Sequence, residues 1–420
     1  MDAHTPRLRV AVVTTRDIGE QNGRAQVLSA IVASLSRRYD VKLIRLLSIA
    51  ETKSWMDLGR AARLWTVSLL KFRPMPLQCL LYASGAQCQN IASEITQMGC
   101  DAVYLDTVRC QSLLYALRRE QPNLHIVTDF DDLMSRRAKF LADKNLAFST
   151  GHIGRHFPRW LRYLIDVALA PAVTAYEALT LPAAEHDVVA RSDATVLISR
   201  VDRQHLCNRL RRDVQVQIHA IGPMFNLKRM PWTIGAPLRF VFVGSDSYIQ
   251  NRSAIDFLTR YWSDHRPATP LHIYGRQHRT LPQIPGLHWH GYVTDIAEAY
   301  QPGSIALAPA LDRGGIKTKV LEAWSWGCPV LGNAAAFEGL SVADYPLMFP
   351  ESAWRPFLND PAAHMVSWLR AAGLGSGFVR RVLSPEKFEQ AWGEIMLPAS
   401  IAMTARTNAA LRTVAVQNAN

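Results

Sequence analysis

The stretch Ser304–Leu340, SIALAPALDRGGIKTKVLEAWSWGCPVLGNAAAFEGL, decides the fold of this chain. It begins with an apolar run at 305–308 followed by a proline, which is typical of a buried parallel strand. The adjacent glycines Gly314 and Gly315 come next, and the apolar spacing after them predicts a helix over 316–326. A glycine and a proline then end the helix before a second apolar strand. The stretch therefore predicts a strand–loop–helix–strand unit of an α/β fold.

A glycine loop between a strand and a helix N-terminus is a geometry that accepts phosphate, because its backbone N–H groups can turn toward a ligand. Lys317 and Lys319 add positive charge where the helix dipole already favours an anion. Glu322 lies about one helical turn further on and can accept hydrogen bonds from sugar hydroxyls. The same residues also fit a surface loop with solvated lysines, so this pattern alone leaves two interpretations.

The same stretch resembles the donor-site signature of retaining nucleotide-sugar glycosyltransferases with the GT-B fold, of family 4 or a near neighbour. The resemblance covers most of the C-terminal half and, more weakly, the N-terminal half. Its matching positions are Gly315, Lys319, Glu322, Ala323, Gly327, Pro329, Val330, Glu338, Gly339 and Leu340. It implies an α/β fold with two doubly wound, Rossmann-like domains that face a cleft, and a C-terminal helix that crosses back to the first domain.

The resemblance also implies roles in the donor site. Glu322 would hold the ribose of a UDP- or GDP-linked sugar. Lys319 and the backbone amides of Gly314, Gly315 and Ile316 would hold the diphosphate, whose departure they would stabilise electrostatically. Neither a metal nor a cofactor beyond the sugar nucleotide would be required. Many family members carry another Glu eight positions before the ribose Glu, and this chain has Gly314 there. How the hexose is held therefore stays open.

A second departure from the family concerns the first strand of the second domain, which ends at Gly244. Many members place an Arg and Lys pair after this glycine to neutralise the diphosphate, and the pair is absent here. The basic residues that could replace it are Arg276, Arg313 and Lys319, with Lys319 the strongest candidate and Arg313 its catalytic neighbour.

The N-terminal half opens with a βαβ pattern, in which a loop with two glycines separates a strand at 8–14 from a helix at 24–38. In the resembled family this loop faces the cleft and the acceptor. The acceptor-side candidates are Asp17, Glu20 and Arg24. Each of them also fits a helix cap or a solvated charge.

Carboxylates gather after the strand predicted at 125–129, in the sequence DFDD. They stand where α/β enzymes place their sites, at the carboxyl end of a strand. If the enzyme inverts configuration it needs a base in the first domain, and Asp129 or Asp131 would supply it. A helix-capping role is the alternative. We reject a metal-binding D-x-D motif of the GT-A fold, because the phosphate-site signature lies far downstream.

A chain of 420 residues suits two domains of roughly 200 residues each. A segment with three prolines, 221–237, is the expected interdomain linker. We therefore expect an acceptor-binding domain over 1–225 and a nucleotide-sugar-binding domain over 226–383. Residues 384–420 would form the crossing-back helix and a tail.

The net charge of +12 indicates an anionic partner, such as nucleic acid, an acidic membrane face or a phosphorylated substrate. No nucleic-acid-binding module is recognisable, so we predict no nucleic-acid partner. Six scattered cysteines and the isolated pair His288 and His290 predict no metal site. The charged N-terminus and the absence of a long apolar run predict a cytoplasmic protein, peripheral at the inner face of the membrane if it contacts one.

Two segments bear on membrane contact. A helix over 51–73 would gather apolar and aromatic residues on one face and basic residues on the other, as interfacial helices do. Apolar residues on its polar side equally fit a core helix, so both interpretations stay open. The segment 136–162 interleaves basic and aromatic residues, which fits a membrane surface, a lipid-linked anionic acceptor or a solvated basic face.

The predicted function is transfer of a sugar to a glycan, lipid-linked or other acceptor, with retention, in bacterial-type polysaccharide or glycoconjugate synthesis. Three alternatives remain: a GT-B sugar-nucleotide epimerase, a basic scaffold that binds nucleic acid or membrane, and a catalytically inert scaffold suggested by Gly314. The sequence leaves the sugar, the acceptor and the oligomeric state open.

Overall fold

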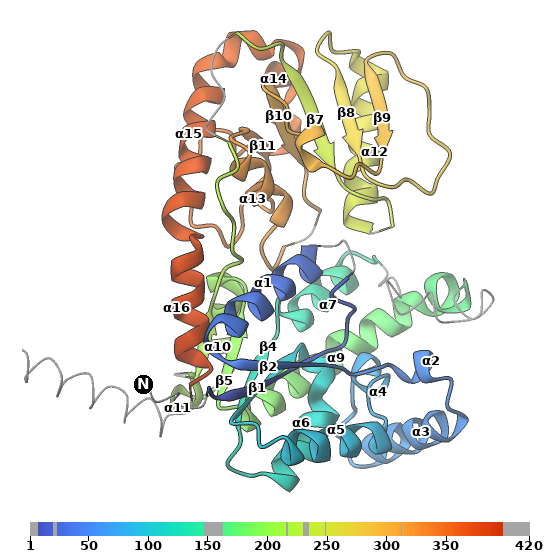
Figure 1. Ribbon diagram of the computed structural model, residues 1–420. Helices are drawn as coiled ribbons and strands as arrows, with labels where there is room; N and C mark the ends of the chain where they lie inside the picture. The colour runs from blue at the N-terminus through green and yellow to red at the C-terminus, as the bar shows by residue number, and fades with distance from the viewer. Residues whose placement is uncertain are drawn as a thin grey trace, which may run out of the picture.

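The computed structural model describes residues 7–19, 23–146, 163–215, 217–229, 235–247, 249–311 and 313–397. One parallel sheet forms in each half of the chain, and a column of two C-terminal helices runs along one side of both halves (Figure 1). This arrangement confirms the prediction of two doubly wound domains.

The first sheet has the strand order β2-β1-β3-β4-β5-β6, and all of its pairs are parallel. Its strands are β1 (Arg9–Thr14), β2 (Asp40–Arg45), β3 (Ala102–Asp106), β4 (His125–Asp129), β5 (Ala194–Leu197) and β6 (Ile218–Ala220). Its helices are α1 (Gly23–Arg38), α2 (Ile49–Thr52), α3 (Trp55–Leu70), α4 (Leu77–Leu80), α5 (Gly85–Gln97), η1 (Val108–Cys110), α6 (Gln111–Glu120), α7 (Met134–Asp143), η3 (Leu164–Leu169), α9 (Ala170–Arg191), α10 (Arg200–Cys207) and α11 (Arg212–Gln215). The central strands are buried along almost their whole length, since helices cover both faces of the sheet, and their polar residues gather at the carboxyl ends.

The second sheet has the order β11-β10-β7-β8-β9, again with parallel pairs. Its strands are β7 (Arg239–Val243), β8 (Leu271–Tyr274), β9 (Leu287–Gly291), β10 (Ser304–Ala308) and β11 (Val330–Gly332). The helices of this half are α12 (Ile249–His265), η4 (Ile296–Glu298), α13 (Thr318–Ser325), η5 (Glu351–Ala353), α14 (Arg355–Asn359), η6 (Pro361–His364), α15 (Met365–Val382) and α16 (Pro385–Ile395).

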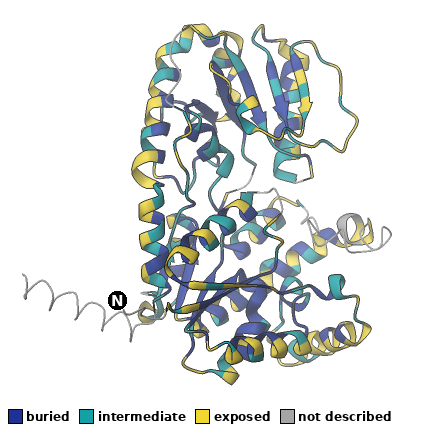
Figure 2. Ribbon diagram, viewed as in Figure 1, coloured by how far each residue is buried: buried dark blue, intermediate teal, exposed yellow. Residues whose placement is uncertain are grey.

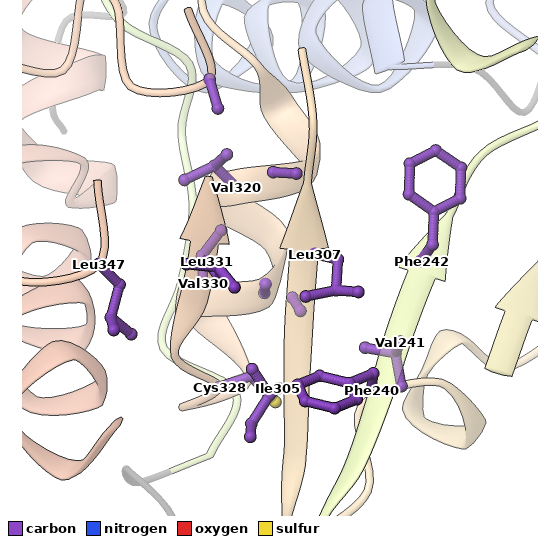
Figure 3. Close-up of a cluster of buried hydrophobic side chains, with 14 of the residues drawn as sticks. Phe240, Val241, Phe242, Ile305, Leu307, Val320, Cys328, Val330, Leu331 and Leu347 are labelled. Carbon is purple, nitrogen blue, oxygen red and sulfur yellow. The ribbon is translucent and has the colours of Figure 1, made fainter. Parts of the chain in front are cut away.

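The core of the second domain joins β7, β10 and β11 to α13. Phe240, Leu307 and Val320 are buried together there (Figure 3). Trp324, at the far end of α13, is fully buried against α15, and a Cβ added at Gly375 would lie 2.3 Å from its ring. Only glycine permits this approach of the two helices. The packing fixes the direction of α13, and therefore the position of its N-terminus.

The final helix, α16, packs on α1 of the first domain, as the resemblance implied. Tyr39 donates a hydrogen bond to the carbonyl of Gly393 at 2.9 Å, and Trp392 packs on Tyr104 with ring centroids 5.5 Å apart. These buried aromatic contacts tie the end of the second half of the chain to the first sheet.

The helix predicted over 51–73 is divided in two. Lys53 adopts a left-handed conformation with φ 52°, and Ser54 caps α3 by accepting from the amide of Asp57. The interpretation as a core helix is wrong, because α3 buries only Asp57 and Ala61 and exposes its large apolar side chains (Figure 2). Residues 147–162 of the second basic segment lie outside the described residues. Among the described residues, no helix has the length and apolar character needed to cross a bilayer.

Candidate functional site

The second sheet reverses its strand order between β7 and β10, since β8 and β9 extend one edge and β11 extends the other. Ligands of open α/β sheets bind beyond the carboxyl ends of the strands at such a point. The loop after β10 contains Gly314 and Gly315, with φ angles of 114° and 59°. These left-handed conformations delay the helix, so α13 begins at Thr318 and the predicted start at 316 was too early.

The amides of both glycines point at carboxylate oxygens. The N–H of Gly314 donates to Oε2 of Glu338 at 2.7 Å, and the N–H of Gly315 donates to Oδ2 of Asp202 at 2.6 Å. Asp202 belongs to α10 of the first domain, so the second hydrogen bond crosses between the domains. The loop therefore presents backbone donors to anionic oxygens, which is the property that a diphosphate site needs.

Arg136 joins the two carboxylates. Its guanidinium donates to Oδ1 of Asp202 at 3.0 Å and to Oε1 of Glu338 at 2.7 Å. Glu338 was part of the family signature, but neither Arg136 nor Asp202 was predicted as a site residue. The S-x-x-D pattern from Ser199 to Asp202 marks the start of a helix, and the structure confirms that capping interaction. The pattern gives no sign that the aspartate also reaches the other domain.

A cavity of about 160 Å³ opens beside these contacts. The second domain contributes the loop from Gly314 to Thr318. The first domain contributes Gly23, Arg24, Val27, Asp131, Asp132, Arg137 and Ile198. The predicted diphosphate loop and part of the predicted acceptor side thus share one interdomain cavity.

Lys319 and Glu322 occupy successive turns of α13. Nζ of Lys319 donates to Oδ1 of Asn251 at 2.7 Å and lies 4.4 Å from the ring centroid of Phe242. The hydroxyl of Tyr300 donates to Glu322 at 3.5 Å. Burial raises the pKa of Glu322, although Tyr300 and Lys319 act in the opposite direction. Asn251 was not among the predicted site residues.

Arg24 lies at the start of α1 and is almost completely buried. Its guanidinium contacts Asp106 at 2.6 Å, Asp129 at 3.0 Å and Asp131 at 3.2 Å. Burial acts to lower the pKa of Arg24, but the three carboxylates raise it well above its ordinary value. Asp129 also accepts from Tyr104 at 2.7 Å. Asp129 is therefore fully engaged in holding the strand ends together, and only Asp131 of the two predicted bases lines the cavity.

Asp131 has two unusual properties. Its φ angle is 64°, a strained conformation for a residue with a side chain. Burial raises its pKa to about 6, against the attraction of Arg24. A carboxyl group with a pKa in this range, next to a cavity, can exchange a proton near neutral pH.

The other predicted site residues are not among those that line the cavity. A Cβ added at Gly244 would lie 2.8 Å from the side chain of Asn251, which would have to shift. Arg276 is exposed and lies over Tyr292, with its guanidinium 5.8 Å from the ring centroid. Arg313 is exposed. Asp17 is also exposed and accepts from the amide of Gly19, while Glu20 lies outside the described residues.

The histidines of the second sheet stack on one another. The ring of His272 lies 4.9 Å from that of His288 and 5.0 Å from that of His290, and burial lowers the pKa of His272 to about 4. This packing accords with a structural role. Within the described ranges, no group of three His, Cys, Asp or Glu side chains is placed to hold a metal ion.

Sequence comparison places the second domain in a known family. Residues 237–345 match the family described as glycosyl transferases, group 1. The second domain of this chain is therefore similar to the group 1 glycosyltransferases. Comparison with curated proteins by sequence gives no match.

Solved structures extend the likeness to both domains. The lipopolysaccharide outer core galactosyltransferase WaaB is 14% identical with a TM-score of 0.55, covering 91% of this chain and 99% of WaaB. HepE from Anabaena, in complex with UDP and glucose, is 10% identical with a TM-score of 0.61, covering 92% and 98%. Sucrose-phosphate synthase from Thermosynechococcus elongatus is 14% identical with a TM-score of 0.60, covering 93% and 98%. These likenesses establish the GT-B fold over nearly the whole chain.

Proposed function

We propose that this glycosyltransferase moves a sugar from a UDP- or GDP-linked donor to a hydroxyl group of a glycan or lipid-linked acceptor. The segment 226–383 binds the donor, the segment 1–225 binds the acceptor, and 384–420 carries the helix that ties them together. Synthesis of a polysaccharide or glycoconjugate is the setting that best fits this chemistry, and the likeness to WaaB supports it.

One observation carries the proposal. The Gly314 and Gly315 amides point at anionic oxygens beside an interdomain cavity, and α13 continues from that loop with Lys319 and Glu322. A diphosphate fits the first group of donors, and a ribose fits a half-buried carboxylate one turn further along the helix. This combination supports a ligand-binding role for the loop, which a solvated surface loop would not have.

Catalysis by this site would depend on stabilising the negative charge that develops on the leaving diphosphate. As the bond between the sugar and the diphosphate breaks, negative charge grows on the leaving phosphate. Lys319, Arg313 and the amides of Gly314 to Ile316 stabilise that charge, and this stabilisation supplies catalysis without a metal. In the retaining reaction the leaving phosphate accepts the proton of the attacking hydroxyl, so no separate protein base is needed.

UDP is the donor nucleotide to test first. The comparison structure of HepE contains UDP and glucose, and another contains UDP-glucose. Isothermal titration of the full chain with UDP, GDP and their sugar derivatives tests the proposal. Binding of one nucleotide series, with release of free nucleotide when an acceptor extract is added, is the expected result. A chain that binds none of these compounds would not be a sugar-nucleotide enzyme.

Asp131 supports a second version of the reaction. Its position on the cavity wall and its pKa of about 6 suit a base that removes the proton of the acceptor hydroxyl. A base in this place would give inversion of configuration. The anomeric configuration of the product, read by NMR before it equilibrates, separates the two reactions. An isomerised sugar nucleotide formed without any acceptor would instead identify an epimerase.

A further inference from the structure

Helix α3 turns its large apolar side chains toward solvent, whereas an ordinary amphipathic helix turns them toward the core. Its buried residues are Asp57 and Ala61, while Trp55 is 85% exposed and Leu70 is 73% exposed. The exposed apolar residues on it and just after it are Trp55, Met56, Leu58, Leu64, Trp65, Leu69, Leu70 and Phe72. We call this surface the α3 face. Monomeric proteins rarely leave so many large apolar side chains together in water, so the α3 face indicates an interaction site.

Charge identifies the partner. The segment 53–73 carries five basic residues, and all five are exposed: Lys53, Arg60, Arg63, Lys71 and Arg73. Its one acidic residue, Asp57, is buried and lies 3.8 Å from Arg60. The apolar surface is therefore bordered by positive charge with almost no negative charge to offset it, which complements an anionic surface.

The arrangement along the helix fits a bilayer surface. At 100° per residue, Leu58, Trp65 and Leu69 fall in one stripe that continues through Trp55, and Arg63 falls on the flank of that stripe. Such a helix can lie in the plane of the interface, with its apolar stripe among the acyl chains and its basic flank among the headgroups. Five of the eight exposed side chains are not aromatic, which makes this surface less suited to nucleic acid, whose binding sites use stacking aromatic rings.

The position of α3 leaves the cleft accessible. Its inner face packs on α4. At the edge of the exposed stripe, the indole of Trp65 donates to the hydroxyl of Tyr176 at 2.8 Å. The helix lies at the outer edge of the first domain, away from the second sheet (Figure 1). A protein held by the α3 face therefore keeps its interdomain cavity unobstructed.

We propose that the α3 face docks this enzyme on an anionic lipid membrane. The proposal deepens the acceptor side of the proposed function, since a docked enzyme meets lipid-linked acceptors at the surface where they reside. Membrane binding does not itself depend on the identity of the donor, so the two proposals can fail separately.

The experiment is co-sedimentation of the full chain with vesicles of phosphatidylcholine alone or mixed with phosphatidylglycerol, at about 0.1 M and about 1 M NaCl. The expected result is binding to the mixed vesicles at low salt and weaker binding at high salt. Replacing Arg63 and Lys71 by Gln lowers the partition coefficient by about fivefold per charge. Replacing Leu58 and Leu70 by Ser lowers it by roughly tenfold or more.

Matched controls come from the other domain. Val366→Ser with Leu374→Ser removes exposed apolar side chains from α15, and Arg260→Gln with Arg370→Gln removes exposed charges. These variants keep full vesicle binding if the α3 face is the docking site. Nucleotide titration of every variant shows that it is folded, and it tests the donor site independently.

Three results would overturn the proposal. The α3 variants and the controls could bind vesicles equally, which would place the contact elsewhere. The protein could ignore anionic vesicles but form a dimer, by light scattering, that the leucine variants abolish; the α3 face would then bind a second copy. It could instead bind oligonucleotides through the same basic residues, which would identify a nucleic-acid site.

Discussion

The amide of Gly315 donates to the carboxylate of Asp202 at 2.6 Å, across the boundary between the two domains. A donor proposed to bind at this loop must therefore compete with a carboxylate that belongs to the protein. The neighbouring amide of Gly314 is engaged in the same way by Glu338, and Arg136 holds both carboxylates. The two acidic side chains occupy the backbone donors that a diphosphate would use, and displacing them would release one interdomain contact.

Removing Glu338 should consequently strengthen nucleotide binding. Glu338→Ala frees the amide of Gly314, and the affinity for UDP should rise by roughly 1–2 kcal/mol, the order of a hydrogen bond to a charged group. Isothermal titration measures the change, with the exposed Glu94→Ala as the control. Weaker binding, or none, would mean that Glu338 shapes the loop for the ligand instead of competing with it.

Glu322→Ala should have the opposite effect. The proposed hydrogen bonds from ribose hydroxyls to this carboxylate are lost, which weakens nucleotide binding by about 1–3 kcal/mol. The exposed Glu298→Ala, in the same domain, is the matched control for removal of one negative charge. Equal affinity of the wild type and Glu322→Ala would rule out the ribose role.

Lys319→Ala should lower kcat more than it lowers donor affinity. The ammonium group stabilises charge that develops only as the diphosphate leaves, so its loss raises the barrier more than it weakens the ground state. Steady-state kinetics with a fixed acceptor separates kcat from KM, and Lys42→Ala on the exposed side of β2 serves as the control. A change in KM alone would show that Lys319 only binds the donor.

Asp131 should make folding stability depend on pH. Burial raises its pKa from 3.8 to about 6, so between these values the folded protein holds a proton that the unfolded chain has released. Stability therefore falls as pH rises through this window, by about 1 kcal/mol for each unit of pKa shift. Asp131→Asn resembles the protonated form and should escape this loss.

Urea denaturation of the wild type and Asp131→Asn from about pH 4 to about pH 7 measures the difference. The advantage of the variant should grow up to pH 6 and then stay constant. The exposed Asp17→Asn controls for the removal of one carboxyl group. A difference between wild type and Asp131→Asn that does not change with pH would mean that Asp131 stays ionised throughout.

Local patterns predicted most of the fold. The strand at 305–308, the glycines after it and the helix before Gly327 all follow from apolar spacing and from backbone preferences that neighbouring residues set. The crossing-back helix followed from the family resemblance, and its contact with α1 confirms it. The prediction failed for 51–73, where helical spacing was correct but could not tell whether the apolar face turns inward or outward.

The sequence by itself indicated the strands and helices, the glycine loop and the candidate residues Lys319 and Glu322, because short-range periodicity and residue type are enough to suggest them. The arrangement in two domains came from the family resemblance. Only the tertiary structure decided that Asp129 forms an ion pair with Arg24 while Asp131 lines the cavity. It alone also decided that Asp202 accepts a hydrogen bond from the amide of Gly315. These relationships join residues 105 and 113 positions apart. The first depends on how α1 packs on the first sheet and the second on how the two domains meet, and no local pattern of side chains encodes either.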